Sequence, residues 1–410
     1  MSQPILVFNV PAHGHVNPTL PVVRELSARG HRVIYYDAEE FRGKIEAAGV
    51  EFRPYPLRGF TADFAGRASS LPAVSAFLLE QSLRLLPFAV EEIGRENAGL
   101  IVFDSIAIWG MQAARLCDLP SVASISTPIY DGVRGAVSLR DSFHLLRGAL
   151  PALLPIVRRR RELVARFGSE VFPRRSIFPC LGDANLVHTS RAFQPDSPLI
   201  DDSFHFVGAS IEDSADHHDD DLRDVDIDPD RPLVYLSLGT VYHRAPAFFR
   251  TAFAAFSDHP ARFVASVGDD ANLEELGPVP HNFLVRPRVN QLGVLRRADA
   301  FITHGGMNSI SEALHFGVPL VVVPRQIEQA LNGRRVAALS AGVLLGDRPP
   351  YGTVNEVQLR TALDQVLHHP EYTAAARRLA EASRRAGGYL QAASVIESLL
   401  VGKRGDDDGR

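Results

Sequence analysis

Two histidines stand in a turn that follows the first apolar stretch of the chain. Residues 5–10 form a mostly apolar run, and Pro11-Ala12-His13-Gly14-His15-Val16-Asn17-Pro18 comes directly after them. An imidazole, with an ordinary pKa of about 6.5, is the natural general base at neutral pH. It can take the proton of a hydroxyl group that is otherwise a poor nucleophile. The turn therefore contains a candidate base, although a turn histidine can equally be a helix cap or a solvated side chain.

A carboxylate that could orient such a base occurs at the end of another apolar run. Asp104 follows residues 100–103. A histidine base works best when a carboxylate holds its second ring nitrogen. If both segments are strands of one parallel sheet, their carboxyl ends meet at one edge. Asp104 is therefore the expected partner, and the alternative is that it only caps a helix before Ile106.

A second cluster of polar and glycine residues lies in the other half of the chain. Thr303-His304-Gly305-Gly306-Met307-Asn308-Ser309 joins an expected strand to an expected helix. Glycines let the backbone approach a ligand, and a helix N-terminus offers N–H groups to an anion. Gly239 and Thr240 follow another strand in the same manner. This chemistry suits a diphosphate, and the alternative is a tight turn before a capped helix. Neither loop matches the glycine patterns of dinucleotide oxidoreductases or P-loop NTPases.

The elements that position these loops follow from the alternation of apolar and polar segments. Strands are expected at 5–10, 31–36, 50–55, 100–103, 121–126, 185–189 and 205–208, then at 233–238, 262–267, 282–285, 300–303 and 319–324. Helices are expected at 18–29, 73–97, 139–167 and 246–256. This alternation predicts an α/β protein of two doubly wound domains with parallel sheets. Ligands should bind at the carboxyl ends of the strands, in a central cleft between the domains.

Length and composition agree with two domains and exclude several classes of protein. The chain has 410 residues, 22% of them charged, and a net charge of -5. That balance provides no basic surface for nucleic acid. The two cysteines indicate a reducing, cytoplasmic location, and no apolar run appears long enough to span a membrane. Residues 211–231 are rich in aspartate and are expected to be a linker, and the charged tail 403–410 is expected to be disordered.

Residues 288–332 resemble the nucleotide-sugar signature of the family-one glycosyltransferases, and the resemblance extends over nearly the whole chain. The family includes plant UDP-glucosyltransferases and bacterial macrolide and flavonoid glucosyltransferases, and the bacterial macrolide type is the most similar. It implies the GT-B fold, with an acceptor-binding domain carrying the base at 1–210. The donor domain would then occupy 232–385, and a helix at 386–402 would return to the first domain.

The resemblance assigns roles to residues of the second half. It places His304, Gly306, Asn308 and Ser309 at the diphosphate, Glu312 at the ribose hydroxyls, Glu328 and Gln329 at the sugar hydroxyls, and Val289 and Gln291 near the base. UDP-glucose is the expected donor. Arg288 stands where the family usually has an aromatic ring on the uracil, so a TDP-sugar stays open as well. The protein donors would neutralise the diphosphate, so no metal and no separate cofactor are expected.

In the family the Gly-His of the N-terminal turn carries the base, which assigns that role to His15 with Asp104 as its partner. The implied reaction is an inverting hexosyl transfer to a hydroxyl of a small apolar natural product, such as a macrolide, polyketide or flavonoid, in antibiotic biosynthesis or resistance. Residues that could line the acceptor pocket, or could equally be core, are His13, Phe60, Phe77, Trp109 and Phe143. A monomer or homodimer is expected. The alternatives are a non-catalytic nucleotide-sugar binding protein and a sugar-nucleotide epimerase of the same fold.

Overall fold

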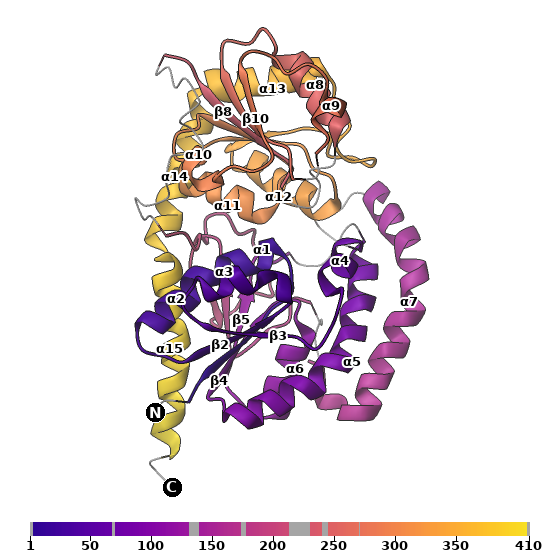
Figure 1. Cartoon of the computed structure of the whole chain (residues 1–410), viewed down its shortest axis with the longest axis vertical. Helices are drawn as coiled ribbons and strands as arrows, with labels where there is room; N and C mark the ends of the chain where they lie inside the picture. The colour runs from indigo at the N-terminus through magenta and orange to yellow at the C-terminus, as the bar shows by residue number, and fades with distance from the viewer. Residues whose placement is uncertain are drawn as a thin grey trace. The chain divides into compact units, whose positions relative to one another are not determined.

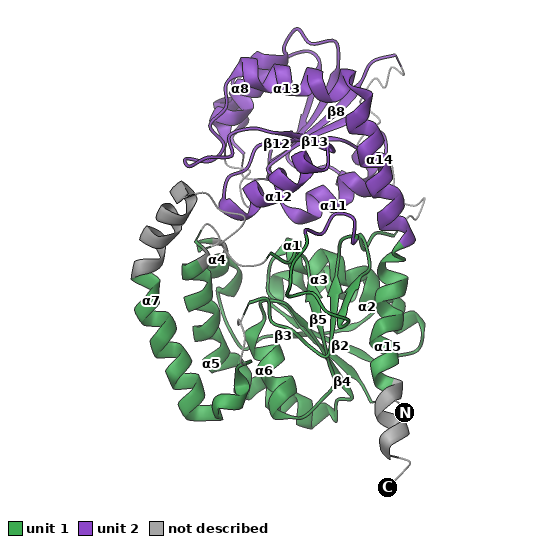
Figure 2. Cartoon of the chain, turned by 180° about the vertical axis from the view of Figure 1, so that it is seen from behind, with its two compact units in different colours: residues 1–190, 196–212, 386–410 green, residues 191–195, 213–385 purple. Residues whose placement is uncertain are grey.

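The computed structural model describes residues 3–67, 70–130, 139–173, 178–212, 230–239, 245–269 and 271–407. The chain forms two compact units, shown in Figure 2. Unit 1 contains residues 1–190, 196–212 and 386–410, and unit 2 contains residues 191–195 and 213–385. Most of the predicted linker, residues 213–229, lies outside the described part of the chain.

Unit 1 is built on a seven-stranded parallel sheet with the order β3-β2-β1-β4-β5-β6-β7 (Figure 1). Its strands are β1 Ile5–Phe8, β2 Val33–Asp37, β3 Glu51–Pro54, β4 Leu100–Asp104, β5 Ser121–Ile125, β6 Ala184–Val187 and β7 Phe204–Phe206. Every residue of β1, β2, β4 and β5 is buried. Helices cover both faces of such a sheet, which is why these strands are continuous apolar runs in the sequence rather than alternating ones.

The helices of unit 1 are α1 His13–Val16, α2 Leu20–Ala28, α3 Arg42–Glu46, α4 Phe60–Ala65, α5 Leu71–Glu96, α6 Ile108–Leu116, α7 Leu139–Phe167 and α15 Gly388–Asp407, with short 3-10 turns at Asn17–Thr19, Glu39–Phe41 and Ser169–Val171. Side chains of β1 alternate between two cores. Leu6 and Phe8 pack with α5 and α6, whereas Ile5 and Val7 pack with α2 and α15. The two helix layers therefore fix the sheet from opposite sides.

The C-terminal helix α15 lies beside α2 in unit 1 (Figure 1). It continues to Asp407, whereas the sequence prediction ended it at residue 402 and expected a disordered tail from 403. No proline follows Pro370, so every residue of this stretch keeps the backbone N–H that a helix needs, although Gly402 and Gly405 lie within it. Residues 408–410 lie outside the described part.

One helix of the described chain is long and apolar enough to cross a membrane, the stretch Pro72–Glu96 of α5. Inside the unit 56% of its apolar window is buried. The helix packs between α6 and α7 (Figure 1). Its apolar side chains thus belong to the core of unit 1.

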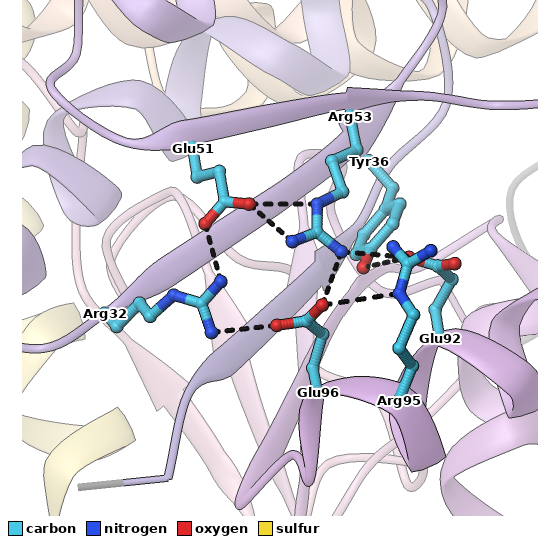
Figure 3. A network of polar contacts seen from close by, with 7 residues as sticks. All are labelled: Arg32, Tyr36, Glu51, Arg53, Glu92, Arg95 and Glu96. Carbon is cyan, nitrogen blue, oxygen red and sulfur yellow. Dashed lines mark hydrogen bonds and ion pairs between the residues drawn. The ribbon is translucent and has the colours of Figure 1, made fainter. Parts of the chain in front are cut away.

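A network of charged groups fixes the end of α5 to strands β2 and β3 (Figure 3). Arg32 donates to Glu51 and Glu96 at 2.8 Å each, and Arg53 donates to Glu51 at 2.9 Å and to Glu96 at 2.7 Å. These hydrogen bonds, chiefly from Arg53, lower the pKa of Glu96 to about 2. The network fixes an edge of the sheet remote in sequence from the two-histidine turn.

Unit 2 is built on a six-stranded parallel sheet with the order β10-β9-β8-β11-β12-β13. Its strands are β8 Leu233–Ser237, β9 Arg262–Ser266, β10 Phe283–Arg286, β11 Ala300–Thr303, β12 Leu320–Val322 and β13 Gly342–Leu344. Its helices are α8 Pro246–Phe256, α9 Leu273–Leu276, α10 Gln291–Leu295, α11 Met307–His315, α12 Ile327–Ala338, α13 Glu356–His368 and α14 Pro370–Arg385. The short strand β13 was not expected from the sequence.

A five-residue segment, Arg191–Pro195, belongs to unit 2, although the sequence prediction placed it within the domain 1–210. Phe193 is buried in the core of unit 2. Arg335 of α12 donates to the Phe193 carbonyl at 2.6 Å. Apolar burial and this hydrogen bond hold the segment apart from the chain on either side of it.

Both sheets reverse their strand order at the first strand of the unit. In unit 1, β1 pairs with β2 on one side and with β4 on the other. In unit 2, β8 pairs with β9 and β11. Loops that leave such a pair of strands turn to opposite sides and leave a crevice at their carboxyl ends. The topology thus selects the ends of β1 and β4, and of β8 and β11, as binding positions.

Candidate active site

His15 and Asp104 meet at the crevice of unit 1. Nδ1 of His15 lies 2.7 Å from Oδ2 of Asp104. The imidazole is 19% exposed and the carboxylate 1%. Because a buried carboxylate facing Nδ1 favours the tautomer with its proton on that nitrogen, the basic lone pair belongs to Nε2. The arrangement suits a base oriented and stabilised by a carboxylate.

The backbone around the pair explains its geometry. In the parallel register Phe8 of β1 lies opposite Phe103 of β4, so the turn after β1 begins beside Asp104. Asp104 also accepts the Ile106 N–H at 2.9 Å through its other oxygen. It is therefore the partner of His15 and the acceptor for an N–H of the turn. It is not the helix cap that the sequence left open, because α6 begins at Ile108 with Ala107 as its N-cap. Ser126 Oγ lies 3.5 Å from His15 Nδ1, at the outer limit of a hydrogen bond.

Asn9 fixes the turn from below, a role the sequence reasoning missed. Its side chain donates to the His15 carbonyl at 3.2 Å and to Tyr35 OH, and accepts the Val10 N–H at 2.7 Å. Asn9 is buried, and buried amides are normally satisfied in this way. A buried polar residue directly after an apolar strand was the available signal.

His13, the local competitor of His15, takes a different direction. Its ring lies 5.0 Å from the Phe41 ring, and its Nδ1 is 3.3 Å from Lys44 Nζ. These contacts lead toward α3 rather than toward Asp104. The structure brings only one of the two histidines to the carboxylate.

Three of the aromatic residues considered for an acceptor pocket are core residues. Trp109 is 0% exposed, and Phe60 and Phe77 are buried with it in one apolar cluster. Trp109 donates to Tyr55 OH at 3.1 Å, which satisfies its indole N–H. These three side chains give the acceptor-pocket prediction no support. Large aromatic rings on helices that cover a sheet commonly fill the core beneath them. Phe143 lies in α7, and its side chain is outside the described part of the chain.

In unit 2, the loop after β11 holds the imidazole of His304 between two glycines. A Cβ on Gly239 would lie 2.5 Å from His304 Cε1, and one on Gly306 would lie 2.5 Å from Nε2. Gly239 also has a φ of 75°. A side chain at either position would collide with the His304 ring unless that ring moved. The two loops of the crevice therefore both pack against this ring. Thr240 lies outside the described residues.

The N-terminus of α11 lies directly after this ring. Its N-cap is Gly306, which has no side chain to occupy the first N–H groups. Asn308 is half-buried and Ser309 buried in the first turn. The first amides of a helix favour an anion through both their hydrogens and the helix dipole. Removal from water, and then the charge of Arg325, lower the pKa of His304 to about 4, so its imidazole is neutral at neutral pH.

Glu312 and Gln291 form a second polar pair next to this loop. Gln291 donates to the Glu312 carboxylate and accepts from Tyr235 OH at 3.2 Å. Desolvation raises the pKa of Glu312 to about 7. A carboxylate can accept from two adjacent hydroxyl groups, which is the arrangement a ribose presents. Both residues are half-buried, so Glu312 is not part of a fully solvated helix face.

Arg288, which replaces the aromatic ring usual in the family, is largely exposed. Its guanidinium forms an ion pair with Asp269 and is 76% exposed. The adjacent Val289 packs against the core of unit 2. The guanidinium thus projects from the segment that follows β10, the edge strand of the sheet.

Glu328 is linked to the His304 loop through Asn332, whereas Gln329 contacts the segment between β12 and α12. Gln329 accepts the Arg325 N–H at 2.7 Å. Glu328 accepts from Asn332 at 2.6 Å, and the same Asn332 amide donates to the Gly305 carbonyl at 3.1 Å. Asn332 was missed from the sequence, although its position four residues after Glu328 on a helix places both on one face.

The described part of the chain contains no group of three or more His, Cys, Asp or Glu side chains placed to hold a metal ion. Both cysteines, Cys117 and Cys180, are thiols. Cys180 is buried in the core of unit 1, and this burial raises the pKa of its thiol. The thiol is therefore poorly suited to act as a nucleophile.

Comparisons with known proteins agree with this geometry. The family described as "Erythromycin biosynthesis protein CIII-like, C-terminal domain" matches residues 251–386. The NDP-glycosyltransferase YjiC of Bacillus subtilis (strain 168) is 34% identical over 400 residues, which are 97% of each chain. The demethyllactenocin mycarosyltransferase of Streptomyces fradiae is 33% identical over 408 residues, 97% of this chain and 86% of that protein.

Solved structures extend the similarity to the fold. The glycotransferase of kitacinnamycin has a TM-score of 0.82 at 26% identity and covers 98% of this chain and 100% of its own. CalG4, the calicheamicin glycosyltransferase, has a TM-score of 0.77 at 28% identity, with 98% of both chains covered. All these relatives are named for glycosyl transfer, which favours an enzyme over the binding protein or epimerase that the sequence left open. The chain therefore belongs to the family-one glycosyltransferases with the GT-B fold, of the bacterial macrolide type.

Proposed function

We propose that this glycosyltransferase moves a hexose from a nucleoside diphosphate sugar to a hydroxyl group of a small, largely apolar natural product, with inversion at the anomeric carbon. The observation that carries the proposal is the pair of His15 and Asp104, 2.7 Å apart at the crevice of unit 1. A histidine with this partner is suited to remove one proton from a hydroxyl group.

The proposed reaction is a single displacement. Nε2 of His15 takes the proton of the acceptor hydroxyl, and Asp104 stabilises the imidazolium that forms. The acceptor oxygen bonds to the anomeric carbon while the bond from that carbon to the diphosphate oxygen breaks. One displacement inverts the centre, so an α-linked donor yields a β-glycoside.

The leaving diphosphate would be bound by the loop after β11. The amides at the start of α11, Asn308 and Ser309 would donate to its oxygens. The pKa of about 4 for His304 supports a neutral hydrogen-bonding role for that ring rather than a charged one. The loops at Gly239 and Gly306 would then serve to hold the ring in position.

UDP-glucose is the donor we propose to test first. Glu328 and Gln329 offer a carboxylate and an amide, which suits a fully hydroxylated hexose. Glu312 and Gln291 would contact the ribose. Arg288 can stack on uracil or thymine through its guanidinium plane, so a TDP-sugar is the second donor to test.

Macrolides are the acceptor class that the relatives favour. One relative is named for demethyllactenocin and another, 29% identical over 414 residues, for oleandomycin. Polyketides and flavonoids are the further classes in the proposal, and a role in antibiotic biosynthesis or resistance follows from it. The cytoplasmic location and the choice between monomer and homodimer stay predictions.

A mass-spectrometric screen tests the proposal. UDP-glucose and TDP-glucose are each incubated with oleandomycin, with a flavonoid and without acceptor. We expect a product heavier by one hexosyl group only when an acceptor is present, with a β-linkage by proton coupling at the anomeric carbon. An α-linked product would contradict the single displacement, and sugar-nucleotide isomerisation without acceptor would contradict a transferase.

A further inference from the structure

Arg325 lies between strand β12 and helix α12, at the carboxyl edge of the sheet of unit 2. Its backbone N–H donates to Gln329 Oε1 at 2.7 Å. The side chain of one of the two expected sugar-binding residues therefore fixes the position of this arginine. No role for Arg325 was expected from its place in the sequence.

Two neighbouring residues, Phe248 and Gly352, restrict where the guanidinium of Arg325 can lie. Its Cζ lies 5.4 Å from the centre of the Phe248 ring. On another side is Gly352, which has a φ of 76° and no side chain. A Cβ there would lie 2.9 Å from Nη1 and 3.0 Å from Cδ of Arg325. The aromatic ring and the glycine together hold the planar group in one orientation.

Two of the donors on this guanidinium have no acceptor among the described residues. Nε and Nη2 of Arg325 are buried and make no hydrogen bond to that part of the chain. Guanidinium groups stay charged in proteins, and buried charged donors are normally paired. An arginine held in place with its donors unused is what a binding site for an anion requires before the anion arrives.

The surroundings of Arg325 identify the anion. Its charge acts on His304, whose loop precedes α11, and desolvation together with that charge lowers the His304 pKa. Its backbone is bound by Gln329 of the expected sugar-binding pair. The group thus lies where the diphosphate side of the donor site meets the sugar side. The donor carries its negative charge on the diphosphate.

We propose that Arg325 binds a non-bridging oxygen of the donor diphosphate and so neutralises the leaving group. The inference rests on the proposed function, because it presumes a nucleotide-sugar donor in unit 2. It adds a cation to a site whose other expected contacts, His304, Asn308 and Ser309, are neutral.

The variant Arg325→Met tests this assignment, because methionine fills much of the same space without charge or donors. We expect its affinity for UDP, measured by calorimetry, to fall roughly 10- to 100-fold, as for a lost hydrogen bond to a charged group. Arg325→Lys keeps the charge but loses the planar fork, and should recover part of the affinity. Arg378→Met, on the exposed face of α14, is the matched control and should bind UDP as the wild type does.

The melting temperature of the ligand-free protein separates a ligand role from a structural one. If the role of Arg325 is to bind an anion, replacing its unpaired charge by methionine should leave the melting temperature unchanged or raise it. A lower melting temperature together with unchanged UDP affinity would show a structural role and overturn the assignment.

Three further outcomes are decisive. If Arg325→Met loses affinity for UDP-glucuronate but not for UDP, the guanidinium binds a carboxylate on the sugar and the diphosphate assignment is wrong. If the wild type binds neither UDP nor TDP, the proposed function fails together with the inference. Unchanged UDP binding in Arg325→Met, beside a wild type that does bind UDP, overturns the inference alone.

Discussion

Nδ1 of His15 lies 2.7 Å from Oδ2 of Asp104, although 89 positions separate the two residues in the chain. The contact follows from the pairing of β1 with β4, which places the turn after one strand beside the end of the other. Because Asp104 is buried and holds the Ile106 N–H with its second oxygen, its orientation toward the imidazole is fixed.

Asp104→Asn should abolish most of the turnover while preserving the fold. An asparagine can still accept the Ile106 N–H, but its amide would donate to Nδ1 and move the imidazole proton to Nε2. The base would then have no lone pair toward the acceptor. We expect kcat to fall on the order of 10²- to 10⁴-fold with an unchanged dissociation constant for UDP. Near-normal turnover in this variant would show that the carboxylate does not act through His15.

Gly239→Ala should damage the donor site more than its strain alone explains. The added Cβ would meet the His304 ring at 2.5 Å, and the φ of 75° adds roughly 1–2 kcal/mol of strain. Gly49→Ala is the control, because its φ of 74° is nearly the same and nothing lies within 4 Å of the new Cβ. We expect both variants to have a lower melting temperature than the wild type. Only Gly239→Ala should lose affinity for UDP. Equal affinities in the two variants would remove His304 from the donor site.

Donor binding should depend on pH through Glu312. Its pKa is raised to about 7, and the ribose hydroxyls need the carboxylate form as acceptor. Below pH 7 the group must lose a proton to bind, so the affinity for UDP-glucose should fall from pH 8 to pH 6, up to about tenfold per unit well below the pKa. Calorimetry in Glu312→Gln should show weaker binding without this slope. A slope of the same size in that variant would assign the titration to another group.

Asn332→Ala should affect recognition of the sugar more than of the nucleotide. Asn332 joins the Glu328 carboxylate to the Gly305 carbonyl and is buried. Losing it leaves that carbonyl without this donor and releases Glu328, at a cost of about 1–3 kcal/mol in the free energy of unfolding. We expect KM for UDP-glucose to rise several-fold while the affinity for UDP changes little. An equal loss for both ligands would show that Asn332 supports the whole loop instead.

The sequence was sufficient for those parts of the site that topology alone determines. Asp104 and the two-histidine turn follow neighbouring strands of a parallel sheet, so their places in the chain were enough to expect a histidine beside this carboxylate. The choice of His15 over His13 came from the family resemblance. The alternation of apolar segments likewise predicted two parallel sheets, because strands buried on both faces must be apolar throughout. Family resemblance added the signature at residues 288–332, which residue types alone did not distinguish from a capped turn.

Features that depend on packing could not be predicted in this way. No local pattern shows that Phe193 enters the core of unit 2, or that Gly239 and Gly306 enclose one imidazole ring. From the sequence alone, Trp109 could line a pocket or fill a core. Only the structure shows that it is fully buried. The unused donors of Arg325 are likewise visible only once every neighbour is placed.

The most direct test of the account compares His15→Ala with the wild type for both turnover and UDP binding. Removing the imidazole removes the proposed base and leaves unit 2 untouched. We expect β-glycoside formation to fall at least 10²-fold, as for the loss of a general base, with the dissociation constant of UDP unchanged. Turnover at the wild-type rate in His15→Ala would contradict the account, since the acceptor proton would then leave by another group.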